Sequence, residues 1–88
     1  MNLETYFETL LERLEKSDIG NDGKDANGFF EPTRAMLYQR LNLLRDLHGK
    51  PHAKVMVRTA WQYVVDHAPA EWLKMDASLK KEIQEMLS

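Results

Sequence analysis

The sequence predicts an all-α fold: a small antiparallel bundle of four principal helices, with a Gly/Asn/Asp-rich loop after the first. Apolar residues recur at the spacing of one helical face in four separate segments, and no stretch shows the period of two expected of a strand. The connections after the second and third segments are short, which favours antiparallel neighbours. Because 88 residues suffice for one compact domain and not for two, we expect a single helical domain over residues 1–88.

The first helix is predicted over residues 3–17, with Asn2 as its N-cap. Its apolar face consists of Leu3, Tyr6, Phe7, Leu10, Leu11 and Leu14. Residues 20–28 hold three of the four glycines together with Asn and Asp, which is the composition of turns. We therefore expect a flexible loop there, with Gly20 available to end the helix.

A second helix is predicted over residues 32–48, because Pro32 suits a first helical position and Gly49 suits the position after the last. Its apolar side chains cover an arc of roughly 160°, so this helix should pack on more than one neighbour. They are Met36, Leu37, Leu41, Leu43, Leu44 and Leu47. Arg40 falls near the middle of this arc. We expect it to form an ion pair between helices or to reach past the core edge; the functional alternative is that it lines a cleft for an anionic ligand or a partner's carboxylate.

The third helix is predicted over residues 51–68, with a proline at its start and another directly after its end. Its apolar stripe consists of Ala53, Met56, Val57, Ala60, Trp61, Val64 and Ala68. A short helical turn is expected near residues 70–74. Asp76 should then cap a last helix over residues 77–87.

The composition argues against several chemistries. The chain has no cysteine, which excludes disulfides, thiolate metal sites and cysteine nucleophiles and predicts a reducing, cytoplasmic setting. The first residues lack the pattern of a signal peptide, and no apolar run approaches the length of a membrane span, so we expect no membrane association. No nucleophile and base, and no set of metal ligands, stand at a recognisable spacing. We therefore expect no enzyme activity, no catalytic residue, no metal and no cofactor.

The charges are unevenly distributed along the chain. Residues 1–31 hold eight acidic and three basic side chains, a net charge of −5, whereas residues 34–58 hold six basic and one acidic, a net charge of +5. Four carboxylates lie on one flank of the first helix, namely Glu4, Glu8, Glu12 and Glu15. Arg34, Arg40 or Arg45 of the second helix should face them; otherwise each segment is an exposed patch that can steer a partner.

These features predict a small helical protein–protein interaction or regulatory module, which could act as a homodimer. The alternative is a nucleic-acid-binding protein that uses the basic segment 34–58 in an arrangement like a helix-turn-helix. The candidate interaction surface combines the basic side chains of that segment with apolar side chains that a small bundle does not fully bury. It comprises Arg34, Arg40, Arg45, Lys50, Lys54, Arg58, Tyr38, Val55, Phe29, Phe30 and Trp72.

Overall fold

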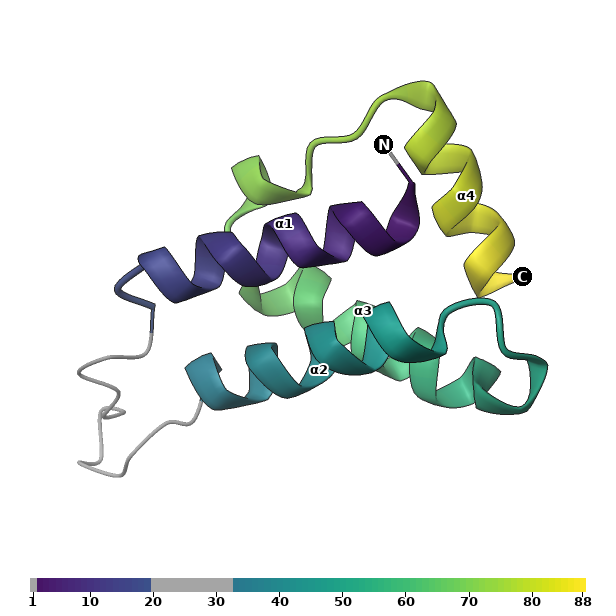
Figure 1. Ribbon diagram of the computed structural model, residues 1–88, viewed down its shortest axis with the longest axis horizontal. Coiled ribbons are helices and arrows are strands. Elements are labelled where there is room, and N and C mark those ends of the chain that lie inside the picture. Colours follow the sequence, from purple (N-terminus) through teal and green to yellow (C-terminus); the bar gives the residue numbers. More distant parts are fainter. Residues whose placement is uncertain (1, 20–32) are drawn as a thin grey trace.

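The computed structural model describes residues 2–19 and 33–88, and every regular element within these ranges is a helix (Figure 1). Four α-helices pack against one another, which confirms the predicted all-α class. The predicted loop over residues 20–28 lies outside the described residues, as do Phe29, Phe30 and Pro32.

Helix α1 (Leu3–Lys16) begins at its predicted N-cap, because the side-chain oxygen of Asn2 accepts a hydrogen bond from the backbone N–H of Thr5 at 2.8 Å. Ser17 has an extended backbone and follows the last helical residue, so the helix ends one residue earlier than predicted. The N–H of Ser17 still donates to the carbonyl of Leu14 at 3.1 Å. The cap at Asn2 and the extended backbone at Ser17 therefore define the length of α1.

Helix α2 (Thr33–Leu47) ends one residue before the predicted residue 48, and Gly49, expected just after the end, has a φ of 81°. The N–H of Lys50 donates to the carbonyl of Leu47 at 3.1 Å and closes this end. The prediction that the third helix starts at residue 51 is wrong. Residues Pro51–Ala53 form a single 3₁₀ turn, η1, and helix α3 (Lys54–His67) begins only after it.

After α3 the chain makes a second 3₁₀ turn, η2 (Ala70–Leu73), at the place where a short helical turn was expected. Helix α4 (Ala77–Leu87) follows. Its N-cap is Asp76, as predicted, and the carboxylate of Asp76 accepts a hydrogen bond from the N–H of Leu79 at 2.8 Å.

Helices α1, α2 and α3 alternate in direction, and α2 packs on both α1 and α3 (Figure 1). Helix α4 runs at a steep angle to these three, near the end of the molecule at which α1 begins, and contacts α1 and α3. The largest fully buried side chains come from the first three helices and are Phe7, Leu10, Leu14, Leu37, Leu41, Leu44, Val57 and Val64. The core therefore lies between the three antiparallel helices, and α4 closes it at one end.

Two side chains lie further from this core than the apolar pattern predicts. On α2, Leu37, Leu41 and Leu44 are fully buried, so Arg40 lies beside the buried stripe instead of at its middle and is half-buried. On α3, Met56 was expected in the core stripe but is 53% exposed. In both cases the buried stripe is narrower than the full arc of apolar residues, because each helix turns only part of its surface toward its neighbours.

Candidate functional site

Arg34 was predicted to face the carboxylates of α1, but it binds the backbone at the C-terminal end of that helix instead. Its guanidinium donates to the carbonyls of Glu15 at 2.9 Å, Ser17 at 2.8 Å and Ile19 at 3.2 Å. The last carbonyls of a helix have no partner within the helix and carry partial negative charge. Arg34 therefore joins the start of α2 to the end of α1 through hydrogen bonds that also complement the helix dipole.

Arg58 has a similar role at another helix end. Its Nε donates to the carbonyl of Leu87, the last residue of α4, at 2.8 Å. This bond joins the outer side of α3 to the C-terminal end of α4 and compensates a carbonyl that the helix leaves unpaired. Two of the six basic residues of segment 34–58 thus bind backbone carbonyls within the molecule.

Among the described residues of segment 34–58, Arg45 both forms an ion pair and lies in the electric field of the α1 carboxylates. Its Nε donates to Asp46 Oδ1 at 3.0 Å. The pKa of the Arg45 guanidinium is raised above its ordinary value, first by this hydrogen bond and further by the negative charges of Asp46, Glu8 and Glu4. Arg45 therefore lies where α2 meets the acidic side of α1.

Of the three arginines predicted to face the acidic flank of α1, Arg45 lies in the field of Glu8 and Glu4, whereas no described residue forms an ion pair between α1 and α2. The ion pairs among the described residues lie within single helices: Lys16 with Glu12 at 3.2 Å, and Arg45 with Asp46. Arg40 forms no ion pair with a described residue. Carboxylates of α1 therefore remain exposed on one side of the molecule, while the basic residues of α2 are held mainly by other groups.

Arg40 lies against an aromatic ring of the neighbouring helix. Its guanidinium carbon is 5.6 Å from the centre of the Tyr63 ring on α3, and its Nη1 donates to Gln39 Oε1 at 2.6 Å. The Tyr63 ring is also stacked on the imidazole of His67, at a centroid distance of 4.0 Å and an angle of 17°. These contacts hold the positive charge of Arg40 at the boundary between α2 and α3.

At this boundary the surface is hollowed by a groove of about 250 Å³, which we call the α2–α3 groove. Its lining consists of Arg40, Leu43, Val55, Met56, Thr59 and Ala60. Val55 is 74% exposed, as the sequence predicts, and Met56 is 53% exposed. Together they place two large apolar side chains in solvent beside a half-buried arginine.

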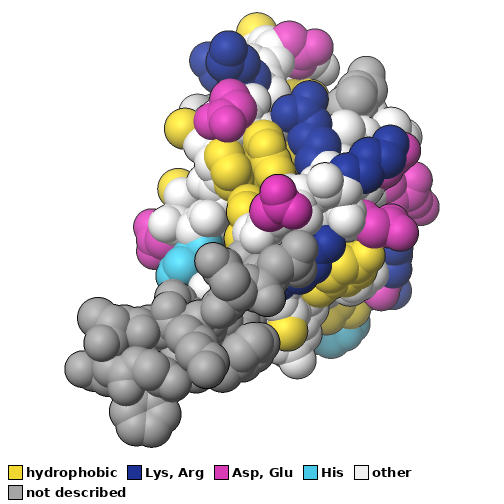
Figure 2. Space-filling view, turned by 90° about the vertical axis from the view of Figure 1, so that its left-hand side faces the viewer, with side chains coloured by type: hydrophobic (Ala, Val, Ile, Leu, Met, Phe, Trp, Pro, Cys, Tyr) yellow, Lys and Arg dark blue, Asp and Glu magenta, His cyan; other side chains and the backbone are white. Residues whose placement is uncertain are grey.

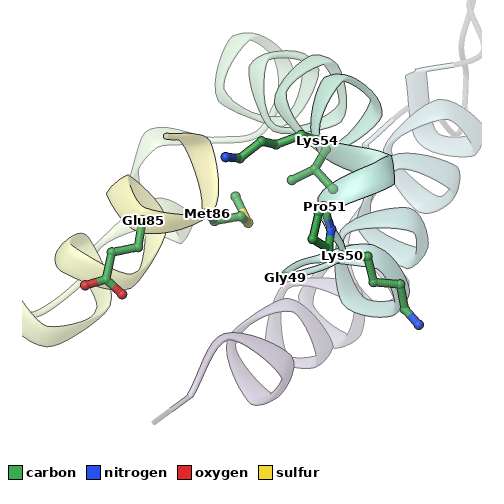
Figure 3. A pocket seen from close by; sticks show the side chains of 7 residues that line it. Gly49, Lys50, Pro51, Lys54, Glu85 and Met86 are labelled. Atoms are coloured by element: carbon green, nitrogen blue, oxygen red, sulfur yellow. The ribbon is translucent and has the colours of Figure 1, made fainter.

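Lys50 and Lys54 lie at a different place, around the turn that connects α2 to α3. This turn and α4 enclose a hollow of about 220 Å³ between Gly49, Pro51, Val57 and Met86 (Figure 3). Met86 points toward the turn and Lys54 extends across the hollow, whereas Lys50 and Glu85 point away from it (Figure 3). Both lysines are exposed, and neither forms an ion pair with a described residue.

The remaining predicted surface residues are dispersed. Tyr38 and Trp72 are half-buried and pack against the core, on α2 and η2 respectively. Phe29 and Phe30 lie outside the described residues. The structure therefore brings Arg40 and Val55 together and separates them from Arg34, Lys50 and Trp72, so the predicted surface is not one continuous patch.

Sequence reasoning missed four residues of the α2–α3 groove, namely Leu43, Met56, Thr59 and Ala60. Met56 and Leu43 fit the apolar stripes of their helices and were assigned to the core. The exposure of Met56 could have been inferred from Val55, the apolar residue directly before it. Adjacent residues lie about 100° apart on a helix, so a narrow buried stripe that covers one of them tends to leave the other exposed.

Among the described residues, no three His, Cys, Asp or Glu side chains gather as they would to hold a metal ion. Within the same ranges, no helix is long and apolar enough to cross a membrane. The chain matches no protein-family model, no curated protein and no solved structure. Proposals about its function therefore depend on the geometry of its own surface.

Proposed function

We infer that this protein is a small, non-catalytic interaction module whose α2–α3 groove binds an amphipathic helix of a partner protein. The observation that carries this proposal is the exposure of Val55 and Met56 beside a groove with apolar walls. A helix can place one apolar stripe into such a groove, with anchoring side chains one turn apart. Such a module could also serve a regulatory role, and we place it in the cytoplasm on the basis of its lack of cysteine.

The charge of the groove favours a partner with carboxylates. Arg40 is the charged side chain among the described lining residues, and its contact with Tyr63 fixes its position. A carboxylate on the partner helix would pair with it and give the complex one orientation. A symmetric dimer through the same face would bury both Arg40 side chains in one interface whose described lining residues offer no carboxylate to pair with them. A partner of different sequence therefore fits the groove better than a second copy of this chain.

Binding of nucleic acid to segment 34–58 stays as the alternative prediction. Lys50 and Lys54 are exposed at the turn between α2 and α3, where phosphates could contact them. However, Arg34 and Arg58 donate to backbone carbonyls, and the exposed side of α3 carries Val55 and Met56. This leaves few free cations for a phosphate backbone, and we therefore favour the protein partner.

The experiment is a selection from a displayed library of helical peptides with randomised surface positions, using the whole protein as bait. We expect the selected peptides to share an apolar stripe and at least one Asp or Glu. Val55→Asp or Met56→Asp should weaken their binding by at least about tenfold, because a charge would be buried against an apolar stripe. Arg40→Gln should weaken binding by about fivefold through loss of a charge-assisted contact.

The matched control is Val65→Asp, which places the same charge on the same helix at a residue that is 42% exposed and does not line the groove. Its affinity for the peptides should match that of the wild type. Enrichment of basic peptides, or equal losses with Val65→Asp, would contradict the proposal. Light scattering that shows a dimer lost in Val55→Asp would assign the groove to a second copy. Salt-sensitive binding of mixed-sequence duplex DNA would support the alternative.

A further inference from the structure

His67, the last residue of α3, lies against the same tyrosine ring as Arg40 of the α2–α3 groove. The imidazole of His67 is stacked on the Tyr63 ring with the centroids 4.0 Å apart, and the guanidinium carbon of Arg40 is 5.6 Å from the centre of that ring. His67 is exposed at the end of the molecule that Figure 2 views, where charged and apolar side chains are mixed on the surface. One aromatic ring therefore connects a titratable group to the arginine of the groove.

The hydrogen bond of the His67 ring determines which of its nitrogens can take up a proton. Nδ1 lies 2.9 Å from the backbone carbonyl of Tyr63. Because a carbonyl only accepts, Nδ1 donates in this bond, and Nε2 is the nitrogen that gains a proton when the ring becomes an imidazolium. No described residue forms a hydrogen bond with Nε2. Histidine is the side chain that ordinarily changes its charge between pH 5 and pH 8. Uptake of a proton therefore adds a positive charge here while the bond to Tyr63 keeps the ring in place.

A charged His67 would place two cations around the Tyr63 ring. Imidazolium and guanidinium are both attracted by an aromatic face, and both groups lie within cation–π distance of the same ring centre. They also repel each other, with an energy that near a protein surface is large enough to change an equilibrium several-fold. A carboxylate bound to Arg40 would relieve this repulsion. The affinity of the groove for an acidic partner should therefore rise when His67 takes up a proton.

Other charged side chains lie on the parts of α2, α3 and η2 at this end of the molecule. Among the described residues they are Arg34, Asp66 and Glu71. Arg34 donates to the carbonyls at the end of α1, and Asp66 Oδ1 accepts a hydrogen bond from Gln62 Nε2 at 2.9 Å. All three remain in the variants described below, so a change in the titration of His67 would report the charge of Arg40.

We propose that His67 is a proton-dependent regulator of the α2–α3 groove, which binds an acidic helix more tightly when the imidazole is charged. This inference rests on the proposed function, since it concerns the same groove and the same arginine. His67 does not line the groove and acts on a bound carboxylate through Arg40, which makes it a positioning residue. The coupling is reciprocal: a partner that prefers the protonated form must make His67 hold its proton more tightly.

The first experiment needs no partner and follows the ring protons of His67 by NMR between pH 5 and pH 8.5 in the whole protein. Arg40→Gln should raise the midpoint of this titration by about 0.3–0.5 pH units at low salt, because a neighbouring cation is removed. The difference should disappear at about 1 M salt. Arg45→Gln removes a cation that lies on the α1 side of α2 and should leave the midpoint within about 0.1 pH units. An unchanged midpoint in Arg40→Gln would overturn the proposal whether or not a partner is found.

The second experiment uses an acidic helical peptide recovered by the selection described above. Its affinity for the wild type should be about two- to threefold higher at pH 5.5 than at pH 8, and His67→Gln should remove this difference. His52→Gln, at an exposed histidine of η1 that does not line the groove, is the matched control and should keep it.

The outcomes distinguish this inference from the proposed function. Peptides that depend on Val55 and Met56 but bind equally at both pH values would overturn the regulation by His67 and leave the proposed function intact. A pH difference that persists in His67→Gln would overturn the regulation as well. A selection that recovers no acidic peptide would overturn the proposed function, and the regulation of the groove with it.

Discussion

At the scale of single residues, the arginines of this protein act mostly on backbone carbonyls and on a ring. Arg34 donates to three carbonyls at the end of α1, Arg58 donates to one at the end of α4, and Arg40 lies over Tyr63. A planar guanidinium with five donors suits such multiple contacts better than an ammonium group does. Each of these three arginines therefore connects two helices without pairing with a carboxylate.

Replacement of Arg34 by Ala should lower the free energy of unfolding by about 1–3 kcal/mol, because carbonyls at the end of α1 lose a charged donor. Arg34→Lys should recover part of this loss, since it keeps the charge but not the forked geometry. Urea unfolding measures both. Lys81→Ala, at an exposed residue of α4, is the control and should change stability by less than about 0.5 kcal/mol. Equal effects of Arg34→Ala and Lys81→Ala would show that the contacts contribute nothing.

At the scale of the elements, the ends of the helices were predicted best where the signal is local. Asn2, Gly49 and Asp76 each act within three residues of their own position, so the sequence alone indicates their roles. The contact of Arg34 with the end of α1 spans 15–19 residues and leads to carbonyls, which carry no side-chain signal. Its role therefore could not be predicted without the packing of α1 on α2.

The difference between local and long-range signals also explains which residues of the α2–α3 groove could be predicted from the sequence. The period of 3.6 residues identifies an apolar arc on each helix but not how much of it the neighbours cover. Val55 falls outside the arc of α3 and was predicted to be exposed, whereas Met56 falls within it and was assigned to the core. The α2–α3 groove depends on how deeply α2 and α3 pack, which is a property of the pair and not of either sequence segment.

The end of α2 gives a test at this scale. Gly49 has a φ of 81°, and apart from its chain neighbours no described residue has an atom within 4 Å of the position that a Cβ would take, so its substitution mainly changes the backbone energy. Gly49→Ala should lower the free energy of unfolding by about 1 kcal/mol, and Gly49→Asn should cost less because Asn tolerates this conformation. Thermal unfolding checks both. Lys50→Ala, at the exposed neighbour with a negative φ, should have almost no effect. A Gly49→Ala variant as stable as the wild type would contradict this account of the turn.

At the scale of the whole molecule, the net charge of −2 conceals two opposite regions that the fold leaves largely uncancelled. The carboxylates of α1 meet the basic segment mainly at Arg45, while Lys50 and Lys54 remain exposed elsewhere. An acidic partner helix would therefore be repelled by the outer side of α1 and attracted toward Arg40. The charge distribution would then orient the partner in the α2–α3 groove before close contact forms.

The electrostatic interaction between the acidic flank of α1 and the basic segment 34–58 can be measured with a double-mutant cycle of Glu8→Gln and Arg45→Gln. We expect a favourable coupling at low salt, because the charge of Glu8 contributes to the raised pKa of Arg45. It should be smaller than the effect of Arg34→Ala, since both side chains reach solvent, and it should vanish at about 1 M salt, where the Debye length is about 3 Å. A cycle of Glu12→Gln with Arg45→Gln should show no coupling, because Glu12 pairs with Lys16 instead. A Glu8–Arg45 coupling that persists in high salt would mean that the two helices are held together here by direct contact, and that the acidic and basic regions attract each other at shorter range than the structure indicates.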